Sequence, residues 1–299
     1  MSDVSAIAPA SPRDNRLPLV ALMLGGAAIG GSPIFVRLSE VGPLATAFWR
    51  VALALIPLLI FSWAKPQRAE SRVASASDYA MLMLPGVFLA SDLVLWHLAL
   101  HMTSVANATL LANLAPVFVT LIGWLFLRAT RISALFLAGL VIAMAGIVTL
   151  KGGFAVLGNG DLRGDGLATA AAIFYAGYIL VIGRLRNRFD TVRIMLWSTG
   201  AAAVCILPIA LNAEGHLLPS TAFGWMIVIG LAFISHAGGQ VAITYALAYL
   251  PVAFSSLTLL LQPVVAAIIA WVLLGEAIGA MQAIGGAIVL AGILIARRG

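Results

Sequence analysis

The chain has 299 residues, of which 62% are hydrophobic and 9% are charged, and its formal net charge is +6. A soluble domain carries about 25% charged residues, so this composition excludes an ordinary soluble protein. Apolar segments long enough to cross a hydrocarbon core of about 30 Å recur along the sequence. The cationic residues lie between these segments, which indicates contact with anionic lipid and not with nucleic acid. The composition therefore predicts a multi-pass membrane protein that binds no nucleic acid.

Ten apolar segments follow a polar stretch at residues 1–16, which is predicted to be a cytoplasmic tail. Each segment must be a helix, because an unpaired backbone amide in lipid costs several kcal/mol. The predicted spans are Leu17–Val36, Pro43–Trp63, Tyr79–Leu100, Val105–Leu127, Ile132–Leu150, Gly166–Ile182, Ile194–Leu211, Ala222–Leu247, Val252–Leu274 and Ile278–Ala296. Alternation at period two, the pattern of a membrane β-barrel, is absent, so the predicted fold is an all-α membrane protein.

One stretch of the sequence occurs twice. Residues 105–124 read VANATLLANLAPVFVTLIGW, and residues 252–271 read VAFSSLTLLLQPVVAAIIAW. Pro116 aligns with Pro263 at an offset of 147 residues, which is about half of the chain. The repeat predicts that one unit of five spans was duplicated and fused, and that the function lies between the two copies.

Basic residues in the connections predict how the chain is oriented. If the N-terminus is cytoplasmic, the inner connections and ends carry 13 Lys and Arg and the outer ones carry 3. Both termini, including residues 297–299, are therefore predicted to face the cytoplasm from the inner (plasma) membrane. The repeats at residues 17–150 and 166–296 each hold five spans, an odd number, so the second enters from the opposite side, and the linker at 151–165 is periplasmic. Such an inverted repeat places a substrate site near the midplane of the membrane.

Two charged residues lie within the predicted spans, Arg50 and Asp92. Charges in a membrane are costly, usually face the interior of a helix bundle and are usually paired. Both residues lie about 10 to 12 Å from the outer ends of consecutive spans, estimated from the helical rise. We therefore predict an ion pair between them. The alternative is that Arg50 extends to the outer interface while Asp92 alone faces a cavity.

Polar side chains at helical spacing are further candidates for the wall of a central cavity. His236 and Gln240 are four residues apart, and Ser255, Thr258 and Gln262 follow the spacing i, i+3 and i+7. The predicted cavity residues are Asp92, Trp96, His97, Thr109, Asn113, Tyr175, Tyr178, His236, Gln240, Ser255, Thr258 and Gln262. Their amide, hydroxyl and aromatic groups suit a small zwitterion with an apolar side chain. The alternative is that the polar groups only hydrogen-bond between helices, at about 1 kcal/mol each.

Three prolines interrupt predicted spans: Pro33, Pro116 and Pro263. Proline removes a backbone hydrogen bond and bends a helix. We predict that these prolines are hinges that open and close the cavity. The alternative is that each is a packing defect that neighbouring side chains satisfy.

The chain resembles the drug/metabolite transporter superfamily and, within it, the EamA-type exporters. The resemblance rests on the ten spans, on Phe48-Trp49-Arg50, on the prolines in spans four and nine, and on Leu-Leu-Gly-Glu at Leu273–Glu276. More weakly, the chain is similar to bacterial exporters of neutral and aromatic amino acids. The resemblance implies ten helices around a central cavity and transport of small solutes by alternating access.

Other function classes lack their motifs. The sequence contains no G-x-x-x-x-G-K-[ST] loop, no H-E-x-x-H and no pair of cysteines, so ATP hydrolysis, a cofactor and a metal site are not predicted. We predict a monomeric secondary exporter of small metabolites, with neutral and apolar amino acids as the first candidates, and not an enzyme. Protons are a candidate coupling ion. The alternatives are a broader exporter of drugs, nucleobases or sugars, uptake of the same solutes, a membrane enzyme and a passive channel.

Overall fold

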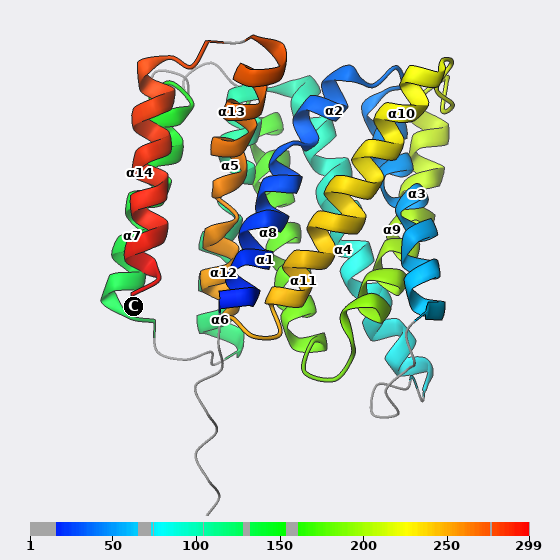
Figure 1. Ribbon diagram of the computed structural model, residues 1–299, viewed down its shortest axis with the longest axis horizontal. Helices are drawn as coiled ribbons and strands as arrows, with labels where there is room; N and C mark the ends of the chain where they lie inside the picture. The colour runs from blue at the N-terminus through cyan, green and yellow to red at the C-terminus, as the bar shows by residue number, and fades with distance from the viewer. Residues whose placement is uncertain are drawn as a thin grey trace, which may run out of the picture.

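The computed structural model describes residues 16–64, 73, 75–103, 105–127, 132–153, 161–275 and 277–298. The first half contains α1 (Arg16–Gly30), α2 (Ser32–Leu38), α3 (Pro43–Ala64), α4 (Ala76–Met102), α5 (Val105–Ala112), α6 (Ala115–Leu127) and α7 (Ala134–Leu150). The second contains α8 (Leu162–Leu185), α9 (Thr191–Ala213), α10 (Ala222–Gly230), the π-helix η3 (Leu231–Gln240), α11 (Val241–Ala246), α12 (Val252–Thr258), α13 (Leu261–Leu274) and α14 (Ala280–Ala296). Figure 1 shows them as one bundle, with no strand in the described ranges, so the all-α prediction is confirmed. The predicted tail, except for Arg16, and residues 154–160 of the linker lie outside the described residues.

The described helices account for the ten predicted spans. Eight helical segments are long and apolar enough to cross a membrane by length and composition, and α7 and α14 are shorter apolar helices of 17 residues each. A helix of that length is about 26 Å long, close to the thickness of the hydrocarbon core. Large apolar side chains such as Val141, Val204 and Leu273 are exposed, as expected of surfaces that contact lipid.

Corresponding helices of the two halves run in opposite directions. In Figure 1, α1 begins and α14 ends at the lower end of the bundle, and α2 leads into α3 at the upper end. Glu214 follows α9 and accepts hydrogen bonds from the N–H groups of Leu44 and Ala45 in α3, at 2.6 and 2.8 Å, so α9 ends at the upper end. Thr103 follows α4 and donates to Asp165 in the first turn of α8 at 2.7 Å. The first half therefore begins at the lower end and the second at the upper end, as an inverted repeat requires.

Aromatic pairs join the two halves at both ends and follow the internal repeat. At the upper end, Trp49 of α3 packs edge-on against Trp225 of α10, with ring centroids 5.0 Å apart. At the lower end, Trp197 of α9 packs in the same way against Tyr79 of α4, at 4.7 Å. Trp49 and Trp197 are 148 residues apart, and Tyr79 and Trp225 are 146 apart. The same contact is therefore made twice, with the roles of the two halves exchanged.

Polar contacts strengthen the same two ends. At the upper end, Thr221 caps α10 by accepting from the N–H of Gly224 at 3.0 Å, and its hydroxyl donates to Glu40, which lowers the pKa of that carboxyl. At the lower end, Arg188 pairs with the buried carboxylate of Asp78 at N–O distances of 2.6 and 3.0 Å. Contacts between the two halves therefore join α3 to α9 and α10 at the upper end and α4 to α9 at the lower end. These four helices form one group that is held together at both ends.

Glycines bring α7 and α14 into close contact. A Cβ atom added at Gly139, Gly146, Gly285 or Gly292 would lie 2.2 to 2.6 Å from a backbone nitrogen of the partner helix. Gly139 and Gly285 are 146 residues apart, as are Gly146 and Gly292. Small residues let helix backbones approach in lipid, where packing rather than the hydrophobic effect drives association. The repeat therefore includes the residues that join these two helices.

Replacing Gly146 with leucine is expected to separate α7 from α14 and to destabilise the protein by about 1 to 3 kcal/mol, the usual cost of overpacking. Thermal unfolding of the purified protein in detergent measures the effect. The matched control is Gly200→Leu in α9, where an added Cβ meets no atom within 4 Å. Equal unfolding temperatures for the two variants would contradict the close packing of α7 and α14.

Candidate functional site

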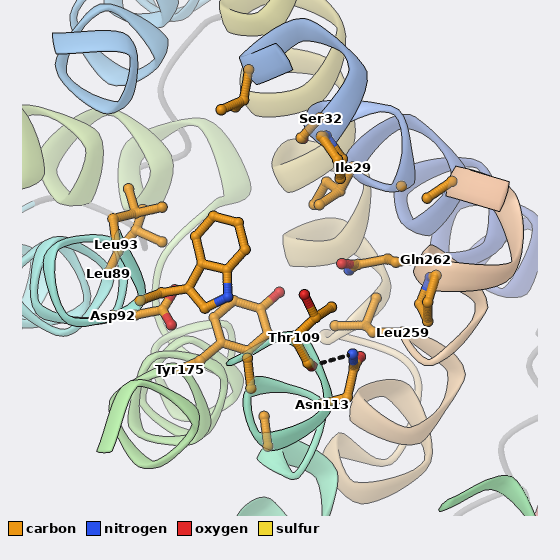
Figure 2. Close-up of a pocket in the computed structure, with 18 of the residues that line it drawn as sticks. Ile29, Ser32, Leu89, Asp92, Leu93, Thr109, Asn113, Tyr175, Leu259 and Gln262 are labelled. Carbon is orange, nitrogen blue, oxygen red and sulfur yellow. Dashed lines mark hydrogen bonds between the residues drawn. The ribbon is translucent and has the colours of Figure 1, made fainter. Parts of the chain in front are cut away.

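A cavity of about 370 Å³ lies in the middle of the bundle and extends toward its upper end. Its wall is built by both halves: α1 to α6 and the end of α7 from the first, and α8, η3, α12 and α13 from the second. Figure 2 shows labelled side chains of α1, α2, α4, α5, α8 and α13 around one space. The cavity therefore lies between the two repeats, where the sequence predicts the site.

Eight predicted side chains line this cavity. They are Asp92, Trp96, His97, Thr109, Asn113, Tyr175, Gln240 and Gln262. In Figure 2, Asp92 of α4 and Tyr175 of α8 lie on one side and Gln262 of α13 on the opposite side. Thr109 of α5 and Asn113, which directly follows α5, lie between them, and the Asn113 amide donates to the Thr109 carbonyl at 2.7 Å. Polar groups from four helices thus face a common space.

Two predicted cavity residues, Tyr178 and His236, are buried behind the wall instead. Tyr178 is 1% exposed, and its hydroxyl donates to Oε1 of Gln240 at 3.4 Å. His236 is fully buried and shares a hydrogen bond of 2.9 Å with Thr199 of α9. The reason is the partner that each group finds behind the wall, Gln240 for Tyr178 and Thr199 for His236 of the π-helix η3.

Ser255 and Thr258 also lie outside the wall of this cavity. Ser255 is fully buried, and Thr258 donates to the Phe254 carbonyl of its own helix at 2.9 Å. Their neighbour Ser256 lines the cavity in their place. One residue corresponds to a rotation of about 100° around a helix axis. The face that α12 turns to the cavity is therefore shifted from the one predicted.

Arg50 and Asp92 both line the cavity, but they do not touch. Among the described residues, no ion pair within 4.0 Å joins them. The physical reason is packing: α3 packs mainly on α9 and η3, whereas α4 packs mainly on α8 and α9. The direct ion pair between Arg50 and Asp92 that the sequence predicts is therefore not formed in this conformation. Both residues instead line the same cavity.

Three buried polar atoms of cavity residues have no hydrogen-bond partner in the described part of the chain. They are Oγ of Ser32, Nε of Arg50 and Nε2 of Gln262. A buried donor without a partner costs about 1 to 3 kcal/mol. Donors left free at a cavity wall are therefore well placed to bind a solute that carries oxygen atoms.

Four polar residues line the wall although no sequence pattern indicated them: Ser32, Thr46, Lys151 and Ser256. Lys151 is the least expected, because the charge count placed it in an outer connection. It directly follows α7, and the pair Gly152-Gly153 turns the chain there with φ angles of 107° and 83°. The glycine pair in the sequence predicts that α7 ends here. It does not predict that the side chain of Lys151 reaches the cavity.

Each predicted hinge proline lies next to an interruption of its helix, and all three line the cavity. Pro33 lies in the first turn of α2, directly after the break between α1 and α2. Pro116 and Pro263 occupy corresponding places at the start of α6 and α13, after the breaks that follow α5 and α12. The interruptions are therefore as predicted, and motion about them stays a prediction.

A solved crystal structure of a protein has the same fold. It superimposes on this chain with a TM-score of 0.78 and 18% sequence identity, over 96% of this chain and 99% of the other. Eight span-length apolar segments and the shorter apolar helices α7 and α14 make up this fold, with the cavity between the two repeats. Residues 16–151 and 162–298 each match the EamA-like transporter family. The chain therefore belongs to this family, which is part of the drug/metabolite transporter superfamily.

Curated relatives are also named as transporters. An uncharacterized transporter of Archaeoglobus fulgidus is 26% identical over 281 residues, 93% of this chain and 95% of its own. A probable terminal-alkyne amino-acid exporter of Streptantibioticus cattleyicolor is 31% identical over 197 residues, 64% of each chain. The pseudopaline exporter CntI of Pseudomonas aeruginosa is 25% identical over 243 residues, 81% of this chain and 82% of its own. The family and these names indicate a transporter rather than an enzyme, with a small-molecule substrate and a bilayer around it.

Proposed function

We propose that the protein is a secondary transporter that exports small metabolites, with amino acids as the first candidates, across the inner membrane by alternating access, working as a monomer. The observation that carries this proposal is the cavity, in which Arg50 and Asp92 supply opposite charges without pairing with each other. A relative named as a probable amino-acid exporter supports the same substrate class.

An amino acid matches the chemistry of this wall. Its carboxylate would be held by Arg50 and by the free donor of Gln262, and its ammonium by Asp92. Trp96 and Tyr175 offer aromatic surface to the side chain. A volume of about 370 Å³ lies in the range of small-molecule sites. Neutral and apolar amino acids are the first candidates on these grounds.

A sealed layer below the cavity supports alternating access. A second cavity, of about 580 Å³, lies at the lower end. Along α1, Ile29 lines the upper cavity and Leu19 the lower one, while Leu22 between them is fully buried. Leu22 belongs to the same packed cluster as Tyr178 of α8 and Leu257 of α12. Such a layer argues against a passive channel, which needs a continuous polar path.

The direction of the cavity follows from the predicted orientation. If both termini face the cytoplasm, the lower end of the bundle is cytoplasmic and the main cavity extends toward the periplasm. This conformation would then be the one that releases an exported solute, and the lower cavity would become the entry path in the opposite conformation. Helices α3, α4, α9 and α10, connected at both ends, would form the fixed frame of this motion.

Release of amino acids from liposomes tests the function directly. Purified protein is reconstituted into liposomes preloaded with single amino acids, and release is measured with and without a pH gradient. We expect release above that of protein-free liposomes for at least one amino acid, faster with the gradient if protons are the coupling ion. No release of any amino acid would refute the proposed substrate class and favour drugs, nucleobases or sugars, which the same liposomes can test.

A further inference from the structure

Lys151 brings a second positive charge to the cavity, and its backbone position is fixed. The N–H of Gly152 donates to the Thr149 carbonyl at 3.0 Å, and the N–H of Gly153 donates to the Val148 carbonyl at 2.9 Å. These two bonds, with both glycines at positive φ, are a Schellman motif that ends α7 at Lys151. The point from which the lysine side chain extends is therefore well defined.

The end of α7 packs against α5 and the α12–α13 break, and this packing places Lys151 beside the cavity. Leu150, the residue before Lys151, belongs to a buried cluster with Leu110 of α5 and with Leu260 and Val264 beside the α12–α13 break. Those elements also supply Thr109, Asn113 and Gln262 to the cavity wall. Lys151 thus reaches the same space as the proposed amino-acid site.

The ammonium of Lys151 has no acidic partner in the described part of the chain. No described Asp or Glu oxygen lies within 4.0 Å of it. Burial lowers the pKa of this group, because no neighbouring negative charge offsets the loss of water. The negative end of the α7 helix dipole beside it favours the charged form.

The charges of the cavity wall therefore do not balance. Arg50 and Lys151 are cationic, and Asp92 is the one acidic residue among the described residues that line it. A neutral amino acid would provide one anionic and one cationic group, for Arg50 and Asp92, and would leave Lys151 without a counter-charge. A solute with a second carboxylate would balance all three.

We propose that the preferred substrate is an amino acid or amino-acid derivative with an additional carboxylate, and that Lys151 is the residue that selects it. The inference rests on the proposed function and changes the expected side chain from neutral to acidic. Arg50 and Asp92 hold the amino-acid group common to all candidates, and Lys151 distinguishes among them.

Glutamate and glutamine provide the test, because they have nearly the same shape and differ in one charge. Binding of each to the purified full-length protein is measured by titration calorimetry in detergent. We expect the unaltered protein to bind glutamate at least about tenfold more tightly than glutamine, as a charge-assisted hydrogen bond implies. Lys151→Met should remove this preference by weakening glutamate binding alone, and Lys151→Arg should retain it. The control is Arg163→Gln, which removes an exposed cation from α8 outside the wall of the cavity.

The outcomes separate this inference from the function on which it rests. Equal binding of glutamate and glutamine to the unaltered protein, together with export of neutral amino acids from liposomes, would overturn the role of Lys151 and leave the proposed function intact. Absence of export for every amino acid would overturn the proposed function itself. If Lys151→Met does not fold, Lys151→Gln takes its place as the variant without the charge, and equal binding of glutamate and glutamine to the unaltered protein still overturns the inference.

Discussion

Asp92→Asn and Arg50→Gln are each expected to lower amino-acid export by about tenfold to 100-fold. Each change removes one of the two opposite charges of the cavity wall; asparagine keeps the size of Asp92, and glutamine is a shorter polar replacement for Arg50. A hydrogen bond to a charged group contributes about 1.5 to 3 kcal/mol, which corresponds to this range. Initial rates of release from preloaded liposomes measure the effect.

The stability of the same variants separates a role in binding from a role in folding. The two charges do not pair in this conformation, so neither variant leaves behind a partner in a broken ion pair. We therefore expect unfolding temperatures in detergent that are unchanged or raised, because a buried charge without a partner is costly. Asp161→Asn is the matched control, since Asp161 is exposed and caps α8, a task that asparagine also performs. If both variants export as fast as Asp161→Asn, Arg50 and Asp92 do not bind the substrate.

The internal repeat made much of the architecture predictable. Pro116 and Pro263 share an offset of 147, and both lie at interruptions next to the cavity. The repeat also extends to contacts that no single residue reveals, such as the edge-on packing of Trp49 on Trp225 and of Trp197 on Tyr79. Composition and symmetry thus predict the number of helices and the place of the cavity.

The rotation of each helix could not be predicted in the same way. Gln240 lines the cavity, whereas His236, four residues earlier on η3, hydrogen-bonds Thr199 of α9 instead. The spacing of polar residues does not reveal which of them finds a partner on a neighbouring helix. On α12, Ser255 and Ser256 have the same chemistry, and only packing decides that Ser256 lines the cavity.

Lys151 shows a different limit. In the sequence it belongs to a polar connection, and a lysine there counts as a topology signal. Its role in the cavity depends on where α7 ends relative to α5 and to the α12–α13 break, which is tertiary information. The two halves are therefore similar in backbone but unlike in charge. Under the proposed function, symmetry would account for the two conformations of alternating access, and the residues that differ between the halves would determine the substrate.

Replacing both Pro116 and Pro263 with alanine is expected to slow export by about tenfold and to stabilise the protein. Alanine restores a backbone N–H that can donate to the carbonyl four residues earlier, so the breaks between α5 and α6 and between α12 and α13 can close. A restored hydrogen bond contributes about 1 kcal/mol, and a straight helix cannot bend at the midplane. Release from liposomes and thermal unfolding in detergent measure the two effects on the same sample.

The matched control is Pro57→Ala, because Pro57 lies inside α3, which continues through it without a break. Helix α3 belongs to the group of helices proposed as the fixed frame. We therefore expect Pro57→Ala to leave the motion of the helices, and the rate of export, unchanged. A double variant that exports as fast as Pro57→Ala would show that the interruptions at Pro116 and Pro263 are packing features. Slower export together with a higher unfolding temperature would mean that the helix breaks reduce stability but are needed for transport. This is the trade-off expected where activity requires flexible helices.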